Sequence, residues 1–397
     1  MSADSSTKMS GASRWVGAGR SASGDARTAA DQAVGDALQG REAKLVVLFA
    51  SEALDLPVLV ARAQELAGDA SLVGCSTAGE IAGGGPGDAG VVALALGGEG
   101  FTIVTAKVTG LAAGPREAGA EVATALSDVT RTPHHLLMLL TDGLAGDQQE
   151  IVRGAHSVAG AGVPLVGGCA GDDLHMVATH QFFDGEVLHD SVVAVGIGSD
   201  APLGIGVRHG WQAVGEPMLV TDSRPNRVDT LDDQPALDIY LERLNAPAQA
   251  RTDREAFIRF ALEHPLGMAR RAGEEQVRWI PSADFESRSL VTNAEVPPGA
   301  LVRLMVGDTA SVLAATDAAC EDAVAGLEGG RPIGMLVFDC AARRAVLGQD
   351  GIAAEIARVE KYADGAPLAG FYTYGEIART RGVAGFHNQT LVVLAIA

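Results

Sequence analysis

Three short glycine-rich segments carry residue types suited to holding a small polar ligand. They span residues 74–81, 167–172 and 370–377. Glycine has no Cβ, so the backbone can approach a ligand closely, and its N–H groups can hold a carboxylate or phosphate. An acid beside such a segment can receive a ligand ammonium group or cap a neighbouring backbone group. One acid stands in each segment: Glu80, Asp172 and Glu376.

The third segment adds aromatic and polar side chains. Tyr372 and Tyr374 flank Thr373, and alternation along an extended chain puts both rings on one face. Such a face is either a stacking wall with hydroxyl tips or ordinary core packing. Residues 386–390, just before the last apolar strand, are rich in polar groups that suit a hydrogen-bonding rim or a structural network. The ligand-binding residues expected from all these patterns are Cys75, Thr77, Gly79, Glu80, Gly168, Cys169, Asp172, Tyr372, Thr373, Tyr374, Gly375, Glu376, His387 and Asn388.

Cysteine chemistry is an alternative use of the same segments. Cys75 and Cys169 lie in expected turns, and His175 follows Cys169 closely, but a nucleophile needs a base in hydrogen-bond contact and a third orienting group. A zinc site from these residues and His180 has poor spacing. The scattered histidines leave a haem axial ligand open, although there is no CxxCH attachment motif. The nucleophile-elbow, phosphate-loop, dinucleotide and HExxH motifs are also absent, so a binding protein is favoured over an enzyme.

A repeated unit positions the glycine-rich segments. Each unit is an apolar strand, a helix, the glycine-rich segment and a second apolar strand, which together indicate α/β layers with buried strands. Matching strings at equal spacing favour a true repeat and pseudo-related lobes, although sequence rich in Ala, Gly and Val can produce similar patterns by chance. The expected strand, helix and strand are 45–51, 56–66 and 91–96; 136–141, 148–159 and 192–197; and 335–340, 352–362 and 391–396.

The middle of the chain has a different pattern of short strands and turns. With 397 residues, two domains are the natural expectation. We therefore expect an α/β protein of two lobes of layered mixed sheets and helices, with some antiparallel strands in the middle region. The expected parts are a flexible tail at 1–11, an N-terminal domain at 12–210 and a C-terminal domain at 211–397. Further expected elements are strands at 15–22, 204–210, 217–222, 277–281, 289–296 and 301–306, and helices at 236–244, 253–262 and 315–327.

The composition limits the partners. The net charge is −20 and no block of Lys or Arg is present, so nucleic acids and anionic membrane surfaces are disfavoured. No segment offers the roughly 18 uninterrupted apolar residues that a spanning helix requires, so membrane insertion is not expected. The four cysteines are widely spaced, which fits a reduced, cytoplasmic protein. Fifty glycines and 4% aromatics indicate closely approaching backbones.

The three segments, taken in order with three further strings, resemble the FIST family. These strings are Trp211 to Pro217, Phe338-Asp339-Cys340 with Arg343, and Phe386 to Thr390. The resemblance covers roughly residues 12 to 397 and includes the N-terminal and C-terminal FIST parts.

The resemblance implies a bacterial sensory protein for small ligands, with amino acids as candidates, bound between the lobes. Family members are often fused to kinase, cyclase or chemoreceptor parts. The resemblance fills this chain, so signalling is expected through a separate partner such as a histidine kinase or a cyclase. Some stand-alone members resemble haem-binding nitric-oxide sensors that regulate a histidine kinase, which leaves haem as an alternative. The ligand is not fixed by the resemblance.

Overall fold

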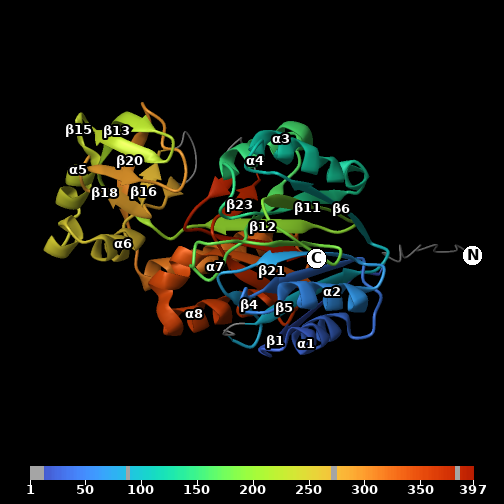
Figure 1. Cartoon of the computed structure of the whole chain (residues 1–397). Helices are drawn as coiled ribbons and strands as arrows, with labels where there is room; N and C mark the ends of the chain where they lie inside the picture. Colours follow the sequence, from blue (N-terminus) through green and yellow to red (C-terminus); the bar gives the residue numbers. More distant parts are fainter. Residues whose placement is uncertain (1–12, 86–89, 270–274, 381–384) are drawn as a thin grey trace, which may run out of the picture.

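The described part of the chain comprises residues 13–85, 90–269, 275–380 and 385–397 of a computed structural model. The tail expected at 1–11 lies outside these ranges. Three repeats, here called repeat 1 (15–97), repeat 2 (101–199) and repeat 3 (203–208 with 309–396), form a layered core. An inserted domain (209–308) projects from one side of this core (Figure 1).

Repeat 1 forms a sheet in the order β1-β5-β2-β3. β2 and β3 are parallel, and β5 runs antiparallel to both β1 and β2. All six residues of β2 are buried, as expected for an apolar strand covered on both faces. Asp25 and Asp55 cap the two helices by accepting bonds from backbone N–H groups. The elements are β1 (Trp15–Ser21), α1 (Ala26–Leu38), β2 (Leu45–Ala50), α2 (Leu56–Ala67), β3 (Ser71–Ser76) and β5 (Val91–Gly97).

Repeats 2 and 3 reproduce this strand order as β6-β11-β7-β8 and β12-β25-β21-β22. Each has the same parallel central pair and antiparallel return strand. Repeat 2 contains β6 (Phe101–Thr109), α3 (Pro115–Val122), the short helices Ala123–Leu126 and Val129–Arg131, β7 (His134–Thr141), α4 (Gln148–Ala159), β8 (Leu165–Cys169) and β11 (Ser191–Ser199). Repeat 3 contains β12 (Leu203–Arg208), α7 (Thr309–Ala325), β21 (Gly334–Cys340), α8 (Ala341–Ala363), β22 (Leu368–Thr373) and β25 (Leu391–Ile396).

The repeats exchange strands in a cycle. At the end of its glycine-rich segment or after it, each repeat sends a short strand to the sheet of another repeat. β4 (Glu80–Ala82) of repeat 1 pairs with β22, β9 (Gln181–Phe183) of repeat 2 pairs with β3, and β23 (Glu376–Arg379) of repeat 3 pairs with β8. β10 (Glu186–Leu188) and β24 (Phe386–His387) extend two of these edges. The exchange makes the three repeats one folding unit.

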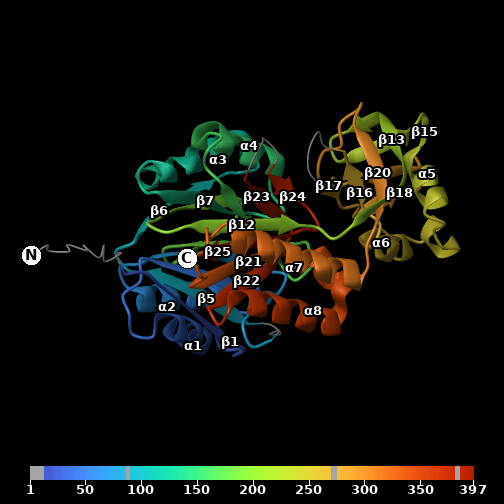
Figure 2. The ribbon, with the colours of Figure 1, turned by 180° about the vertical axis from the view of Figure 1, so that it is seen from behind.

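The centre of the core is shared by all three sheets. Phe49 of β2 packs with Phe371 of β22 at 4.6 Å between ring centroids and with Phe338 of β21 at 6.4 Å. Met138 of β7 belongs to the same buried cluster. Figure 2 shows the elements of repeat 3 between the helices of repeat 1 and those of repeat 2.

Glycines bring helices onto the edge strands. A Cβ on Gly17 of β1 would lie 2.1 Å from the carbonyl oxygen of Ala37 in α1. A Cβ on Gly204 of β12 would lie 1.9 Å from the carbonyl oxygen of Ala323 in α7. Real Cβ atoms do not approach backbone oxygen so closely, so this helix–strand contact requires glycine in both repeats. The glycine-rich composition therefore reflects backbone packing here.

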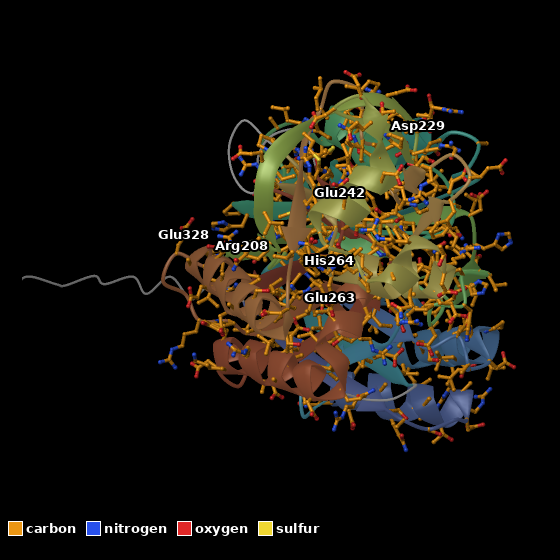
Figure 3. All side chains as sticks on the ribbon, turned by 90° about the vertical axis from the view of Figure 1, so that its left-hand side faces the viewer. Arg208, Asp229, Glu242, Glu263, His264 and Glu328 are labelled. Carbon is orange, nitrogen blue, oxygen red and sulfur yellow. The ribbon has the colours of Figure 1, made fainter. Side chains whose placement is uncertain are left out.

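The inserted domain is built on an antiparallel sheet in the order β17-β16-β20-β13-β14-β19-β18. In the view onto this domain, Asp229 and Glu242 lie on it, whereas Arg208 and Glu328 lie at the core edge beside the end of α7 (Figure 3). Its elements are β13 (Gln212–Arg224), β14 (Arg227–Leu231), β15 (Gln234–Pro235), α5 (Ala236–Arg243), the short helix Ala248–Arg251, α6 (Arg254–Leu262), β16 (Leu266–Met268), β17 (Gln276–Arg278), β18 (Ser282–Asp284), β19 (Ser289–Val291) and β20 (Leu301–Val306).

The expected α/β class, the repeated unit and the antiparallel middle region are confirmed. Two helices begin earlier than expected. α7 starts at Thr309 because Asp308 and Ser311 form a capping box. α8 starts at Ala341 and bends at Gly348, where φ is 61°. No helix within the described ranges is both long and apolar enough to cross a membrane.

Candidate functional site

The three glycine-rich segments lie against one another. Backbone hydrogen bonds join the first segment to the second, the first to the third, and the second to the third. The donor and acceptor pairs are Gly171 N to Ser76 O at 3.0 Å, Ala78 N to Tyr372 O at 2.9 Å, Tyr372 N to Gly79 O at 2.8 Å, Cys169 N to Gly375 O at 2.8 Å and Tyr374 N to Cys169 O at 3.2 Å. These bonds hold the segments directly against one another.

Glycine is needed where these segments touch. A Cβ on Gly171 would lie 2.7 Å from the backbone nitrogen of Ala78, and one on Gly168 would lie 2.7 Å from Cγ2 of Thr373. Gly79 has a φ of +119°, which L side chains rarely adopt. At these positions the glycines serve packing between segments.

Glu80 and Glu376 make matching contacts within their repeats. Each accepts a hydrogen bond from the hydroxyl three residues earlier, that of Thr77 or Thr373. Each also accepts a backbone N–H from the residue preceding its return strand, Gly90 or Thr390, at 3.0 Å. Both carboxyl groups are buried and fasten the start of a strand.

In repeat 2 this role belongs to Asp142, which the sequence analysis did not select. Asp142 accepts the backbone N–H of Asp190 at 2.7 Å, and Asp190 directly precedes β11. It also accepts the Thr179 hydroxyl at 2.6 Å. Asp142 comes from the end of the first parallel strand, whereas Glu80 and Glu376 follow the second, so matching sequence strings alone did not align the three acids.

The two buried glutamates make stability depend on pH. Burial raises the pKa of Glu80 and of Glu376 from 4.5 to about 7, despite the hydrogen bonds from the threonines. The folded state therefore binds these protons more tightly than the unfolded state. Their contribution is fully present below pH 4.5 and is lost as pH rises through 7. Each shift corresponds to about 3 kcal/mol.

We expect the urea midpoint of unfolding to fall between pH 6 and pH 8, and the double variant E80Q/E376Q to flatten this fall. A glutamine can turn its oxygen toward the backbone N–H and donate its amide to the threonine hydroxyl. The exposed substitution E255Q is the control and should leave the slope unchanged. An equally steep slope in the double variant would contradict the assignment.

Asp172 has a different role from the other two expected acids. It accepts backbone N–H groups from Met176, Val177 and Ala178, and the hydroxyl of Tyr374 donates to it. Burial alone would raise its pKa, but these hydrogen bonds hold the pKa of Asp172 below its ordinary value. Asp172 thus fixes the loop after β8 and the orientation of the Tyr374 ring.

The remaining expected residues lie around these contacts. Tyr372 is buried under the guanidinium of Arg344, 5.3 Å from the ring centroid. Nε2 of His387 lies 2.9 Å from the carbonyl oxygen of Ala378. Asn388 is 1% exposed, and its side-chain amide has no partner among the described residues.

Cys75 and Cys169 are buried thiols. Burial raises the pKa of Cys75 well above its ordinary value and that of Cys169 to about 12, which disfavours the thiolate nucleophile. The Cys169 thiol lies beside Thr141 and Gln148, while the ring of His175 contacts Glu52 at the surface. The geometry brings no cysteine–histidine pair together here.

A cavity of about 830 Å³ lies between the core and the inserted domain. It is formed by the loop between β7 and α4, the loop after β8, the start of α8, the third glycine-rich segment, and one side of the inserted domain. Of the expected ligand-binding residues, Thr373 and Tyr374 line it. The other lining residues are Gly143, Leu144, Gly146, Asp147, Gln148, Leu174, Met176, Asn226, Arg254, Ile258, Leu262, Trp279, Pro281, Ser282, Asn293, Ala294, Cys340, Ala341, Ala342, Ala345 and Phe386.

Most of the residues expected to bind the ligand do not line the cavity. The glycine-rich segments lie behind it: Tyr374 reaches its wall, whereas Glu80 fastens β5 and Glu376 fastens β25 away from the lining. The lining residues from α6 and from the strands near Trp279 belong to no recognisable motif, because they are brought to the core by the placement of the inserted domain.

The donor set does not fit a haem or a metal. The described lining contains no histidine; its sulfur atoms belong to Cys340, whose thiol pKa burial raises well above the ordinary value, and to Met176, whose side chain is half-exposed at the rim. No group of three His, Cys, Asp or Glu side chains suited to a metal ion occurs in the ranges that the structure describes. The arrangement suits an organic ligand held by apolar contacts and a few polar groups.

The fold and site define an α/β protein of three strand-exchanging repeats, whose ligand-sized cavity is closed on one side by an inserted antiparallel domain. The sequence matches the FIST N domain over residues 44–234 and the FIST C domain over residues 236–379, so the chain belongs to the FIST family. FIST domains are associated with small-ligand sensing in signal transduction. Residue 210, the expected domain boundary, lies just before β13, whereas the two matched regions meet near residue 235.

Relatives are found in bacteria and in an archaeon. The chain is similar to an uncharacterized protein of Mycobacterium tuberculosis, with 27% identity over 66% of this chain and 67% of the relative. An uncharacterized protein of Mycobacterium bovis shows the same identity and coverage. An uncharacterized protein of Methanocaldococcus jannaschii is 28% identical over 37% of this chain and 30% of its own length.

Proposed function

We propose that this protein is a sensor that binds a small organic ligand in the cavity between its core and its inserted domain and signals to a separate partner protein. The observation that carries the proposal is the cavity itself. Its walls come from repeat 2, repeat 3 and the inserted domain, so a ligand inside it would contact all three. An amino acid or a similar molecule fits the volume of about 830 Å³.

Polar side-chain contacts join the inserted domain to the core in the described part of the chain. They include Gln276 Nε2 to the Phe386 carbonyl at 2.9 Å, Gln389 Nε2 to the Leu262 carbonyl at 2.7 Å, and Arg278 to Gln149 at 3.3 Å. The chain passes between the two parts at 209–211 and at 307–308. A ligand that bridges both parts would favour the closed arrangement by the contacts it makes only there.

The exposed apolar side chains at the cavity rim suggest how a partner protein would detect ligand binding. Leu174 and Met176 line the cavity and are 55% and 52% exposed. Ligand binding would cover part of this apolar rim and change the surface offered to a partner. A histidine kinase or a cyclase is the partner class we propose. The four buried, unpaired cysteines are in keeping with a cytoplasmic location.

Thermal unfolding in the presence of candidate ligands tests the proposal. We expect a ligand at about 100 times its Kd to stabilise the protein by about 2.7 kcal/mol, since it binds only the folded state. The screen should contain amino acids, carboxylates and amines.

Filling the cavity should abolish this stabilisation. Ala345 lines the cavity and is exposed, so A345W is expected to fold and to block the ligand. A353W, at an exposed position of α8 outside the lining, is the matched control. A broad screen without a stabilising compound, or stabilisation that survives in A345W, would contradict the proposed site.

A further inference from the structure

We infer that the ligand is a small carboxylate with an apolar body and one neutral hydrogen-bonding group, rather than a zwitterionic amino acid. This inference rests on the sensor function proposed above. It follows from which polar groups of the cavity already have partners and which do not.

The walls of the cavity are mainly apolar. Side chains from the core and from α6 face each other across it. A ligand filling this space gains most from an aliphatic or aromatic body, at about 25 cal/mol for each Å² removed from water. The large apolar side chains are Leu144, Leu174, Met176, Ile258, Leu262, Trp279 and Phe386.

Arg254 supplies a positive charge to the cavity. It is the first residue of α6, and its guanidinium makes no hydrogen bond or ion pair with any residue in the described ranges. Many other arginines of this chain have such partners; Arg259 on the same helix, for example, pairs with Glu255. A guanidinium binds a carboxylate through two parallel hydrogen bonds, so Arg254 suits the charged end of an anionic ligand.

No matching site for an ammonium group is present in the described lining. Its one acidic residue is Asp147, the N-cap of α4. Oδ1 of Asp147 accepts the backbone N–H groups of Gln149 at 2.9 Å and of Glu150 at 3.2 Å. Because this carboxylate already offsets the positive end of the α4 dipole, the ammonium of an amino acid would lose water without gaining a dedicated ion pair.

Two buried polar atoms of the lining residues could form hydrogen bonds with a neutral group of the ligand. Nε1 of Trp279 and Oδ1 of Asn293 are buried and have no hydrogen-bond partner among the described residues. The two residues are neighbours, because the backbone N–H of Asn293 donates to the carbonyl oxygen of Trp279 at 3.2 Å. One is a donor and the other an acceptor, which together match a hydroxyl group. Buried polar atoms are normally paired, so a ligand hydroxyl here is favoured.

Four probes with one aromatic body separate these features. Phenylpropanoate carries only the carboxylate, phenethylamine only the ammonium, and phenylalanine both; the para-hydroxy derivative of phenylpropanoate adds the hydroxyl. We expect calorimetric titration of the full chain to show the hydroxylated carboxylate binding most tightly. Phenylpropanoate should bind more weakly, and phenylalanine at least tenfold more weakly than phenylpropanoate.

R254Q should weaken both carboxylates by about tenfold or more, because a charge-assisted contact is lost. R259Q, on the same helix but outside the lining, is the control and should leave affinity unchanged. W279F should remove the preference for the hydroxylated probe while leaving phenylpropanoate binding intact.

The outcomes distinguish this inference from the proposed function. If phenylalanine, phenethylamine or another cationic or zwitterionic compound binds more tightly than the carboxylates, or if R254Q binds them as well as the wild type, the carboxylate assignment is wrong but the sensor stands. If no compound of the broad screen binds, the sensor function itself fails.

Discussion

Replacing Gly74, Gly167 or Gly370 with alanine is expected to prevent the protein from folding. These residues occupy the same position on the second parallel strand of repeats 1, 2 and 3. A Cβ would lie 1.9 Å from a carbonyl oxygen of the paired strand at Gly74 and Gly167, and 2.1 Å at Gly370. Relieving such overlap means separating two central strands, which costs a large part of a typical stability of roughly 5–15 kcal/mol. Soluble yield, circular dichroism and urea unfolding measure the effect.

Gly35 gives the matched control. It lies on the exposed face of α1, and an added Cβ there would meet nothing within 4 Å. G35A should stabilise the protein by roughly 0.5–1 kcal/mol, since alanine is the better helix former. The strand exchange predicts that damage in one repeat spreads to all, so each strand variant should lack the structure of the whole core and not of one repeat alone. A variant that unfolds in separate steps, or folds with a normal midpoint, would contradict this account.

The sequence predicts the repeated unit well because the apolar patterns and glycine-rich strings that define it depend on residues close together in the chain. Helix α4 and strand β25 have the bounds expected from their apolar patterns. The strings shared by the first and third segments correspond to a shared geometry, in which Thr77 with Glu80 and Thr373 with Glu376 make the same hydrogen bonds. A hydrogen bond between residues three apart depends on nearby sequence, so matching strings indicate it.

The strand exchange and the cavity could not be predicted in this way. β4 pairs with β22 through contacts such as Ala82 with Ala369, nearly 300 residues away, and small buried side chains of this kind do not identify a partner. Arg254 and Trp279 likewise reach the cavity through the packing of the inserted domain, with no motif around them. The three acids are the most chemically distinctive residues of the segments, but they accept hydrogen bonds from backbone N–H groups and nearby hydroxyls, and none of them lines the cavity.

Replacing Arg343 with methionine is expected to destabilise the protein by about 3–5 kcal/mol, because it leaves buried acids without their cation. Arg343 is fully buried. Its guanidinium donates to Asp339 at 2.6 Å, to Glu355 at 2.5 Å, to Thr316 at 3.0 Å and to the carbonyl oxygen of His209 at 2.8 Å. These partners belong to β21, the far half of α8, α7 and the chain crossing into the inserted domain. Urea unfolding at constant pH measures the loss.

Two further measurements test whether the loss of stability in R343M comes from the unpaired acids: its pH dependence, and the stability of a variant that also lacks the acids. Burial and the neighbouring Glu355 raise the pKa of Asp339, against the lowering effect of Arg343. Without the arginine, Asp339 retains its proton more strongly in the folded state, so the deficit of R343M should grow as pH rises. The triple variant D339L/R343M/E355L removes every charge of the network and should recover most of the stability.

The charged network also connects the cavity to the inserted domain, because Arg343 lies at the start of α8, which forms a wall of the cavity, and donates to the carbonyl oxygen of His209, where the chain crosses into that domain. The triple variant should therefore fold, but a ligand should stabilise it less than it stabilises the wild type. Equal ligand-induced stabilisation in the triple variant and the wild type would show that the network serves folding alone.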